Sequence, residues 1–354
     1  MNSSDPVLSL VRPEILALTP YSSARKEASG GKVWLDANEN PLTPHAGAPR
    51  LNRYPEPQPA ELVSRLASLY GVTPDRLLVT RGSDEGIDLL LRAFCRAGRD
   101  SIVITPPTYG MYAVAAGIQG AAVKTAPLDR ACDFALDVGA VLAAVDPSVK
   151  LVFLCSPNNP TGQLLNRDSV LNVITSLASR AVVVVDEAYA EFTSEPSFVE
   201  ELGAHPNLVV LRTLSKAFGL AGARVGVTLA SPQLIGVLQK IIAPYPIPAP
   251  VARAALDALT PGAIAAARQS ALELVGERRR VAAALAQFPF VRQVWPSDAN
   301  FLLAEVADSA RVMSVARAAG LVIRDRSKDV PNTVRLTIGT AAENDFALET
   351  LARV

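Results

Sequence analysis

Hydrophobic residues from residue 60 onward recur first at helical spacing and then in short continuous runs. Leu62, Leu66 and Leu69 mark one face of a helix that we expect to end near Gly71. The runs that follow predict strands, with helical stretches such as 170–177 between most of them, at 77–80, 102–104, 121–125, 151–155, 181–185 and 208–211. This alternation predicts an α/β fold: right-handed crossovers and a mostly parallel sheet flanked by helices. The run at 181–185 is β-branched in most positions, which is typical of a central strand buried on both sides.

Two proline clusters divide the chain into three parts. Residues 1–59 contain the first cluster and predict an extended arm over a surface, with a partner's surface and a plain linker both left open. The second cluster, at 244–250, marks a boundary between a large domain at 60–248 and a smaller C-terminal α+β domain at 249–354. The patterns within the smaller domain predict a long helix, three strands and two further helices, at 263–287, 291–295, 301–305, 334–338, 308–319 and 341–352.

Composition excludes several classes of protein. The 354 residues are 49% hydrophobic and 19% charged, enough to bury a core, and 34 basic residues balance 34 acidic ones, which argues against nucleic-acid binding. Three scattered cysteines and two distant histidines predict neither a disulfide framework nor a metal site. Without an apolar run near the ~18 residues of a membrane helix, and without a secretion-signal pattern at the start, we expect a soluble, cytoplasmic protein.

Four loops at the carboxyl ends of predicted strands carry the candidate chemistry, because ligands of doubly wound sheets bind there. Arg81–Gly86 is a glycine-bearing turn into a helix that we expect to begin with Ser83 as cap and to end near Gly98; free amides at such a helix start bind phosphate. Ser156–Gly162 is a rigid turn that presents an asparagine amide. Each of these two loops also has a plain structural interpretation, as an ordinary turn.

The other two loops present an acid and an amine. Asp186 ends the buried strand 181–185, where a carboxylate needs a cation or a strong donor, although such acids are often structural. Lys216 lies among small and apolar residues directly after a strand, which disfavours its ammonium form and suits a nucleophilic amine. Ser215 and Arg224 follow the same strand and are suited to holding one phosphate.

These residue types together match the needs of pyridoxal 5′-phosphate: an amine, an acid at the ring nitrogen, donors at the phenolate oxygen and a phosphate cradle. Lys216 and Asp186 would supply the first two, and Asn159 with Tyr189 the third. The helix start at Ser83, with Ser215 and Arg224, would hold the phosphate. Tyr109 is suited to stacking on the ring, with core packing as its alternative role.

At this point the sequence resembles the fold-type I, pyridoxal-phosphate-dependent aminotransferases, and within them the narrower histidinol-phosphate aminotransferase family. The resemblance covers about residue 15 to the end, and its motifs recur in family order. The stretches that carry it are 35–41, 52–55, 81–91, 106–112, 155–162, 186–189, 212–226, 242–246, 324–325 and 335–339. It implies the fold-type I architecture, with a large cofactor-binding domain and a small C-terminal domain.

The resemblance also implies residue roles. Lys216 would bind the cofactor aldehyde covalently and then move the proton at the substrate Cα, Asp186 would pair with the ring nitrogen, and Tyr189 would act beside them in catalysis. The cofactor-binding set that it implies is Ser83, Asp84, Glu85, Tyr109, Asn159, Asp186, Tyr189, Thr213, Ser215, Lys216, Arg224 and Tyr54. Tyr54 would reach the phosphate in the neighbouring subunit of a homodimer.

For the substrate, the resemblance implies Tyr21, Asn38, Arg324 and Arg335. Guanidinium groups bind carboxylate and phosphate alike, so one site would serve glutamate and a phosphate monoester in turn. The reaction implied is the transfer of the amino group of L-histidinol phosphate to 2-oxoglutarate, giving imidazole-acetol phosphate and L-glutamate, in histidine biosynthesis. An aromatic amino-acid aminotransferase, a threonine-phosphate decarboxylase and a non-catalytic regulator with this fold stay open as alternatives.

Overall fold

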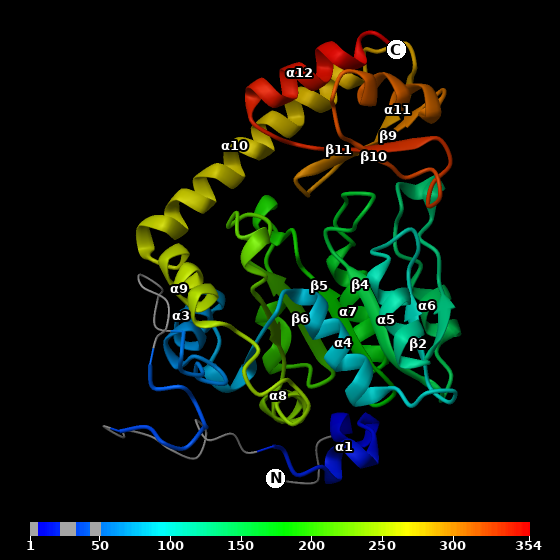
Figure 1. Ribbon diagram of the computed structural model, residues 1–354. Helices are drawn as coiled ribbons and strands as arrows, with labels where there is room; N and C mark the ends of the chain where they lie inside the picture. The colour runs from blue at the N-terminus through cyan, green and yellow to red at the C-terminus, as the bar shows by residue number, and fades with distance from the viewer. Residues whose placement is uncertain (1–5, 22–32, 43–50) are drawn as a thin grey trace.

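The computed structural model describes residues 6–21, 33–42 and 51–354, which form two α/β units stacked end to end (Figure 1). The large unit contains β1 (Leu77–Thr80), β2 (Ser101–Ile104), β3 (Ala122–Thr125), β4 (Val149–Cys155), β5 (Val182–Asp186), β6 (Leu208–Thr213) and β7 (Gly226–Leu229). Its helices are α1 (Pro13–Ala17), α3 (Ala60–Tyr70), α4 (Ser83–Phe94), α5 (Met111–Gln119), α6 (Val138–Ala144), α7 (Arg167–Ser176), α8 (Pro232–Leu238) and α9 (Ala249–Ala258). The small unit has β8 (Val291–Val294), β9 (Phe301–Val306), β10 (Arg324–Asp325), β11 (Thr333–Thr337), α11 (Ser309–Ala318) and α12 (Ala341–Leu351), and α10 (Pro261–Leu285) leads into it.

The seven-stranded sheet of the large unit has the order β1-β7-β6-β5-β4-β2-β3. Strands β3, β2, β4, β5 and β6 are parallel, as the alternating pattern predicts, whereas β7 runs antiparallel to both of its neighbours. The sequence interpretation missed β7, because its four residues come directly after the lysine loop without a helix between them.

The central strand β5 is buried along its whole length, as expected, and its side chains alternate between two cores. Val183 and Val185 pack on one face of the sheet with residues of α3, α6, α7 and α9. Val182 and Val184 pack on the other face with residues of α4, α5 and α8. Helices therefore cover both faces, and the carboxyl ends of the strands are left to form a site.

The helix after β1 begins and ends differently from the sequence expectation. Gly82, with a φ of 75°, is the residue before α4, and Ser83 is its first helical residue rather than a cap. The left-handed conformation favours glycine, which explains why the cap position does not fall on serine. The helix ends at Phe94 instead of near Gly98, because Cys95 is already extended.

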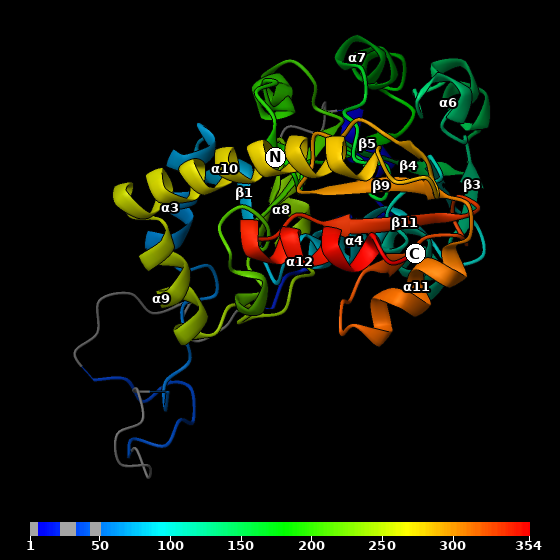
Figure 2. The same cartoon turned by 90° about the horizontal axis from the view of Figure 1, so that it is seen from above.

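The small unit is a four-stranded antiparallel sheet of order β10-β11-β9-β8. Side chains of α10, α11 and α12 pack on it and form a separate core. Viewed from above, α10 runs from α9 to the small sheet (Figure 2). The unpredicted helix α9 buries Ala252 and Ala255 in the core of the large unit. The domain boundary at 248/249 stays a prediction.

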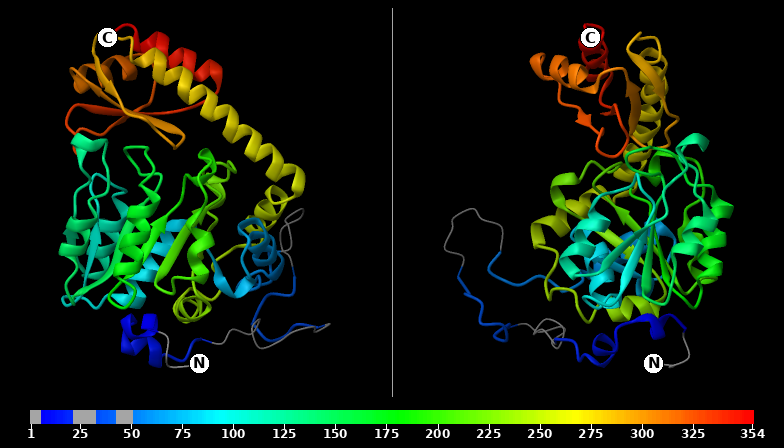
Figure 3. Two further views of the ribbon diagram at one scale, coloured as in Figure 1. Left: turned by 180° about the vertical axis from the view of Figure 1, so that it is seen from behind. Right: turned by 90° about the vertical axis from the view of Figure 1, so that its right-hand side faces the viewer.

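The N-terminal segment is only partly the extended arm that the prolines predict. Residues 6–10 form a 3₁₀ helix, and Val7, Leu10 and Val11 are buried against the large unit at the end remote from the small unit (Figure 3). Residues 33–42 and 51–57 contain no helix or strand and extend away from the large unit (Figure 3). Pro44 and Pro49, with His45, lie outside the described residues. Among those described, no helix has the length and apolarity needed to cross a membrane.

We predict that Gly226→Ala destabilises the fold. A Cβ on Gly226 would lie 2.5 Å from the main-chain carbon of Gly82 and from the amide nitrogen of Ser83, so β7 and the start of α4 would have to separate. Such overpacking costs about 2 kcal/mol of unfolding free energy, measured by urea denaturation. The matched control is Gly262→Ala in the first turn of α10, where no atom lies within 4 Å of the new Cβ. Equal stability of both variants would contradict the prediction.

Candidate active site

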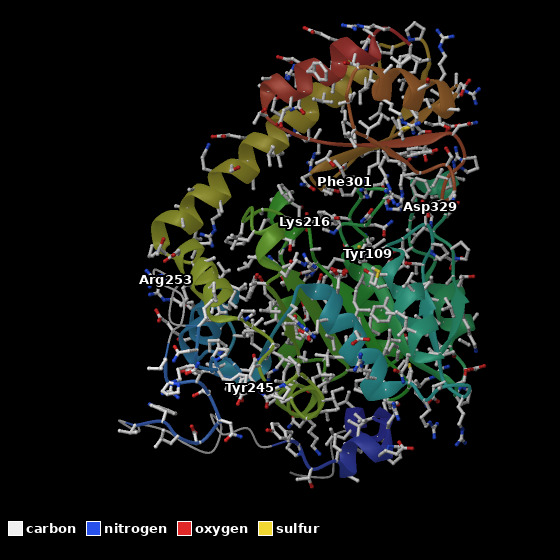
Figure 4. The ribbon with its side chains drawn as sticks, viewed as in Figure 1. Tyr109, Lys216, Tyr245, Arg253, Phe301 and Asp329 are labelled. Carbon is white, nitrogen blue, oxygen red and sulfur yellow. The ribbon has the colours of Figure 1, made fainter. Side chains whose placement is uncertain are left out.

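A cavity of about 220 Å³ lies where the carboxyl ends of β4, β5 and β6 meet the start of α4. Figure 4 shows Lys216 and Tyr109 at this end of the large unit, facing Phe301 of the small unit. Lining residues come from both units: Ser83, Asp84, Tyr109, Cys155, Asn159, Asp186, Ala188, Tyr189, Thr213, Ser215, Lys216, Arg224 and Arg335. Eleven of these thirteen are site residues that the sequence analysis named, so residues far apart in the chain converge on one place.

Asp186 forms the floor of the cavity and is only 2% exposed. The hydroxyl of Tyr112 donates to its Oδ2 at 2.8 Å, and the amide of Ala188 donates to its Oδ1 at 3.2 Å. Burial nevertheless raises the pKa of Asp186 to about 6. A cationic group in the cavity would therefore be stabilised by this carboxylate.

Lys216 lies in the loop after β6, opposite the aromatic ring of Tyr189. Its Nζ is 5.4 Å from that ring's centroid. The residue is exposed at the cavity, yet partial desolvation by the protein beside it, together with the charge of Arg335, lowers the pKa of Lys216. A larger fraction of neutral amine is thus present than on a solvated lysine.

Asn159 connects the two units across the cavity. Its Nδ2 donates to the Tyr189 hydroxyl at 3.3 Å, and its Oδ1 accepts a short hydrogen bond from the guanidinium of Arg335. Arg335 also lies 5.0 Å from the ring centroid of Phe301. The amide of Asp298 donates to Gly162 at 2.7 Å, which ties the loop after β4 to the small unit. These contacts hold Arg335 over the floor of the cavity.

The remaining wall gathers anion-binding groups around the first turn of α4. The guanidinium of Arg224 donates to Ser215 at 3.4 Å and to Asp84 at 3.0 Å. The Tyr109 hydroxyl also donates to Asp84, at 3.0 Å. Helix-start amides, a hydroxyl and a guanidinium together are the donor set that a phosphate monoester requires.

A buried ion-pair cluster behind the cavity fixes the ends of β5 and β6 relative to each other. Arg212, at the end of β6, donates to Glu187 at 2.8 Å and to Glu191 at 2.6 Å. The Glu187 carboxylate also accepts from the amide of Phe198 at 2.7 Å. Because the two strand ends carry Asp186 and the lysine loop, this cluster keeps the acid and the amine in one geometry.

Five residues of the predicted site do not line this cavity. The carboxylate of Glu85 pairs with Arg81, and Tyr21 is 71% exposed. Arg324 is exposed but lies directly opposite Arg335 in the β10–β11 register, so both side chains are on one face of the sheet. Asn38 and Tyr54 border a different hollow of about 500 Å³, where the Tyr54 ring stacks on Tyr245 at 4.5 Å.

Three residues at the cavity were not predicted as site residues. Cys155 and Ala188 line the cavity, and Tyr112 contacts Asp186 from beneath. Cys155 lies opposite Asp186 in the β4–β5 register, and this proximity exists only once the two strands have paired. Tyr112 is the last residue of the stretch 106–112, which carries part of the family resemblance. Its position on an apolar helix predicts core packing alone. No group of three potential metal ligands occurs in the described part of the chain.

Comparisons with known proteins match this chain to aminotransferases along nearly its whole length. The family profile Aminotransferase class I and II matches residues 27–351. The histidinol-phosphate aminotransferases of Stenotrophomonas maltophilia and Aeromonas hydrophila are 47% and 48% identical to this chain, each over 98% of it and 97% of their own length. A crystal structure of histidinol-phosphate aminotransferase from Sinorhizobium meliloti with pyridoxal-5′-phosphate superposes with a TM-score of 0.75 and 25% identity, over 86% of this chain and 83% of that one.

We predict that Asp186→Asn stabilises the protein prepared without cofactor at neutral pH. The native state binds the carboxyl proton more tightly than the unfolded state, so the charged form costs stability that grows as pH rises from about 4 to about 6. The variant avoids this cost and should gain about 3 kcal/mol near pH 8. The gain should vanish near pH 4, as measured by denaturation at each pH. A gain independent of pH would contradict the assignment.

Proposed function

The chain belongs to the class I and II aminotransferases, and from that premise we propose that it transfers the amino group of L-histidinol phosphate to 2-oxoglutarate, using pyridoxal 5′-phosphate. The observation that carries this proposal is the convergence of Lys216, Asp186 and Arg335 on one cavity. Relatives that are 47% and 48% identical over nearly their whole length bear the name histidinol-phosphate aminotransferase, which supports the choice of substrate. The reaction would belong to histidine biosynthesis.

The residues of the cavity fit the cofactor. Asp186 is buried, and its two hydrogen-bond donors, Tyr112 and the Ala188 amide, are both neutral. Its negative charge is therefore suited to accepting a hydrogen bond from a protonated ring nitrogen. The anion-binding wall of Ser83, Ser215 and Arg224 matches the phosphate. Bound there, the cofactor supplies an electron-withdrawing ring that stabilises negative charge at the carbon bearing the substrate amine.

The proposal assigns roles to residues that line or border the cavity. Lys216 would hold the cofactor through its aldehyde and would move the proton at the substrate Cα; the lowered pKa of Lys216 favours a neutral amine for both roles. Tyr189 and Asn159 hold the phenolate oxygen, and Tyr109 contacts the ring face. Asp84, Glu85 and Thr213 complete the cofactor-binding set.

Substrate recognition is assigned to the small unit and the N-terminal segment. Arg335, half-buried over the cavity, binds the phosphate of one substrate and the carboxylate of the other. Arg324, next to it on the same face, adds a second guanidinium. Asn38 and Tyr21 are proposed to contact the substrate in the assembled enzyme.

A homodimer is part of the proposal. Val33, Leu35 and Leu42 are 77%, 86% and 72% exposed in this chain, which is typical of apolar side chains that a partner covers. Tyr54 would then reach the cofactor phosphate of the neighbouring subunit. The enzyme is proposed to work in the cytoplasm.

The substrate choice is tested by loading the protein with pyridoxal phosphate and measuring conversion of the bound cofactor to its amine form. Histidinol phosphate should react far faster than phenylalanine or tyrosine. Faster reaction of an aromatic amino acid would favour an aromatic aminotransferase. Release of carbon dioxide from threonine phosphate would favour a decarboxylase.

We predict that Lys216→Ala abolishes covalent attachment of the cofactor. After borohydride reduction, mass spectrometry of peptides should place the pyridoxyl group on Lys216 in the wild type and on no lysine in the variant. Lys328→Ala, in the loop after β10, is the control and should label like the wild type. A pyridoxyl group on any other lysine of the wild type would overturn the assignment.

We predict that Arg335→Ala slows both half-reactions by about 10²-fold in kcat/KM, because each substrate loses a charge-assisted hydrogen bond. Single-turnover kinetics with histidinol phosphate and with glutamate measure the two effects separately. Arg317→Ala, exposed on α11, serves as the control. If only the glutamate half-reaction slowed, the phosphate would have to bind elsewhere.

A further inference from the structure

We propose that Tyr112 is a positioning residue, whose hydroxyl orients the Asp186 carboxylate so that its open side faces the cavity. The proposal rests on the proposed function, since it concerns how Asp186 meets the ring nitrogen of the cofactor. Tyr112 itself does not line the cavity, and it acts only through the acid.

The hydrogen bonds around Asp186 define the orientation of its carboxylate. Tyr112 donates to Oδ2 at 2.8 Å and the Ala188 amide donates to Oδ1 at 3.2 Å, so each oxygen is held by one donor. A carboxylate offers about four acceptor positions in all. The remaining ones are available to a donor in the cavity that Asp186 lines.

The ring of Tyr112 is held rigidly in place. It is fully buried and stacks on Phe153 of β4, with centroids 4.7 Å apart and planes inclined by 15°. Its edge meets Tyr109 at 5.6 Å and 85°. Since β4 pairs with β5 in fixed register, the phenol and the carboxylate belong to one packed layer. The same tyrosine thus supports Tyr109, which is assigned to the ring face of the cofactor.

The chemistry of this pair favours an ionised acid. Burial and the neighbouring Asp186 hold the pKa of Tyr112 well above its usual range, so its hydroxyl remains a proton donor. A donor to the charged form offsets part of the desolvation of Asp186. Asp84 opposes ionisation of Asp186, whereas Lys216 favours it. Of these influences, the Tyr112 hydrogen bond acts most strongly in favour of the charged form.

A buried tyrosine hydroxyl commonly finds a partner for packing reasons alone, so the test must separate orientation from stability. Tyr70 provides the matched control. Tyr70 is partly buried beside Arg212, and its buried hydroxyl has no hydrogen-bond partner in the described part of the chain. Tyr70 borders another cavity, of about 400 Å³, on the far side of the lysine loop.

The first experiment compares Tyr112→Phe with Tyr70→Phe in binding pyridoxal phosphate and its 1-deaza analogue, in which C–H replaces the ring nitrogen. Tyr112→Phe should weaken binding of pyridoxal phosphate about tenfold. It should leave binding of the analogue unchanged, because the analogue has no ring nitrogen to pair with Asp186. Tyr70→Phe should change neither. Equal losses for both ligands would mean that Tyr112 only supports packing and would overturn the proposal.

The second experiment needs no cofactor and therefore succeeds or fails independently of the proposed function. The stabilisation produced by Asp186→Asn is measured against pH, by thermal denaturation, in the wild-type and Tyr112→Phe backgrounds. Loss of the donor should raise the native pKa of Asp186, and so the pH at which the stabilisation levels off, by about one pH unit. An unchanged levelling pH would show that Tyr112 does not act on Asp186. If that pH rose but pyridoxal phosphate did not bind to the wild type, the proposed function alone would fail.

Discussion

Parallel pairing of β4, β5 and β6 is the constraint on which the rest of the structure depends. It places three carboxyl ends side by side, and a residue with a distinct chemistry lies at or shortly after each end: Asn159, Asp186 and Lys216. The ladder hydrogen bonds allow no slip of one residue, since a slip would turn every side chain to the opposite core. The valines of β5, which alternate between the two cores, therefore stabilise the geometry of the cavity as well as the fold.

The cavity combines a rigid floor with a wall from a separate unit. Packed aromatic rings hold Asp186 from beneath, and the Arg212 cluster holds the strand ends from behind. Arg335 arrives on β11, whose position depends on the hydrogen bonds between the loop after β4 and the segment near Asp298. Movement of the small unit would thus change the contact between Arg335 and Asn159 before it disturbed the floor.

Much of the fold was predictable because local pattern and burial agree. The strands of the parallel part and the long helix of the small unit were placed to within a few residues. Two of the elements that were missed, β7 and α9, have a common cause: each is defined by what packs against it. The antiparallel β7 fits between β1 and β6 only because Gly226 has no side chain to collide with the start of α4.

By itself, the sequence determined which chemical groups this protein possesses: a lysine among small residues, an acid ending a buried strand, and motifs whose order identifies a family. These are local properties, readable from neighbouring residues. Only the tertiary structure decided which groups meet. It placed Arg335 over Asn159 and Tyr112 beneath Asp186, and it separated Tyr54 and Asn38 from the cavity of their own chain. Such contacts join residues more than seventy positions apart in the chain, as in Tyr112 and Asp186, and they depend on packing rather than on any local pattern.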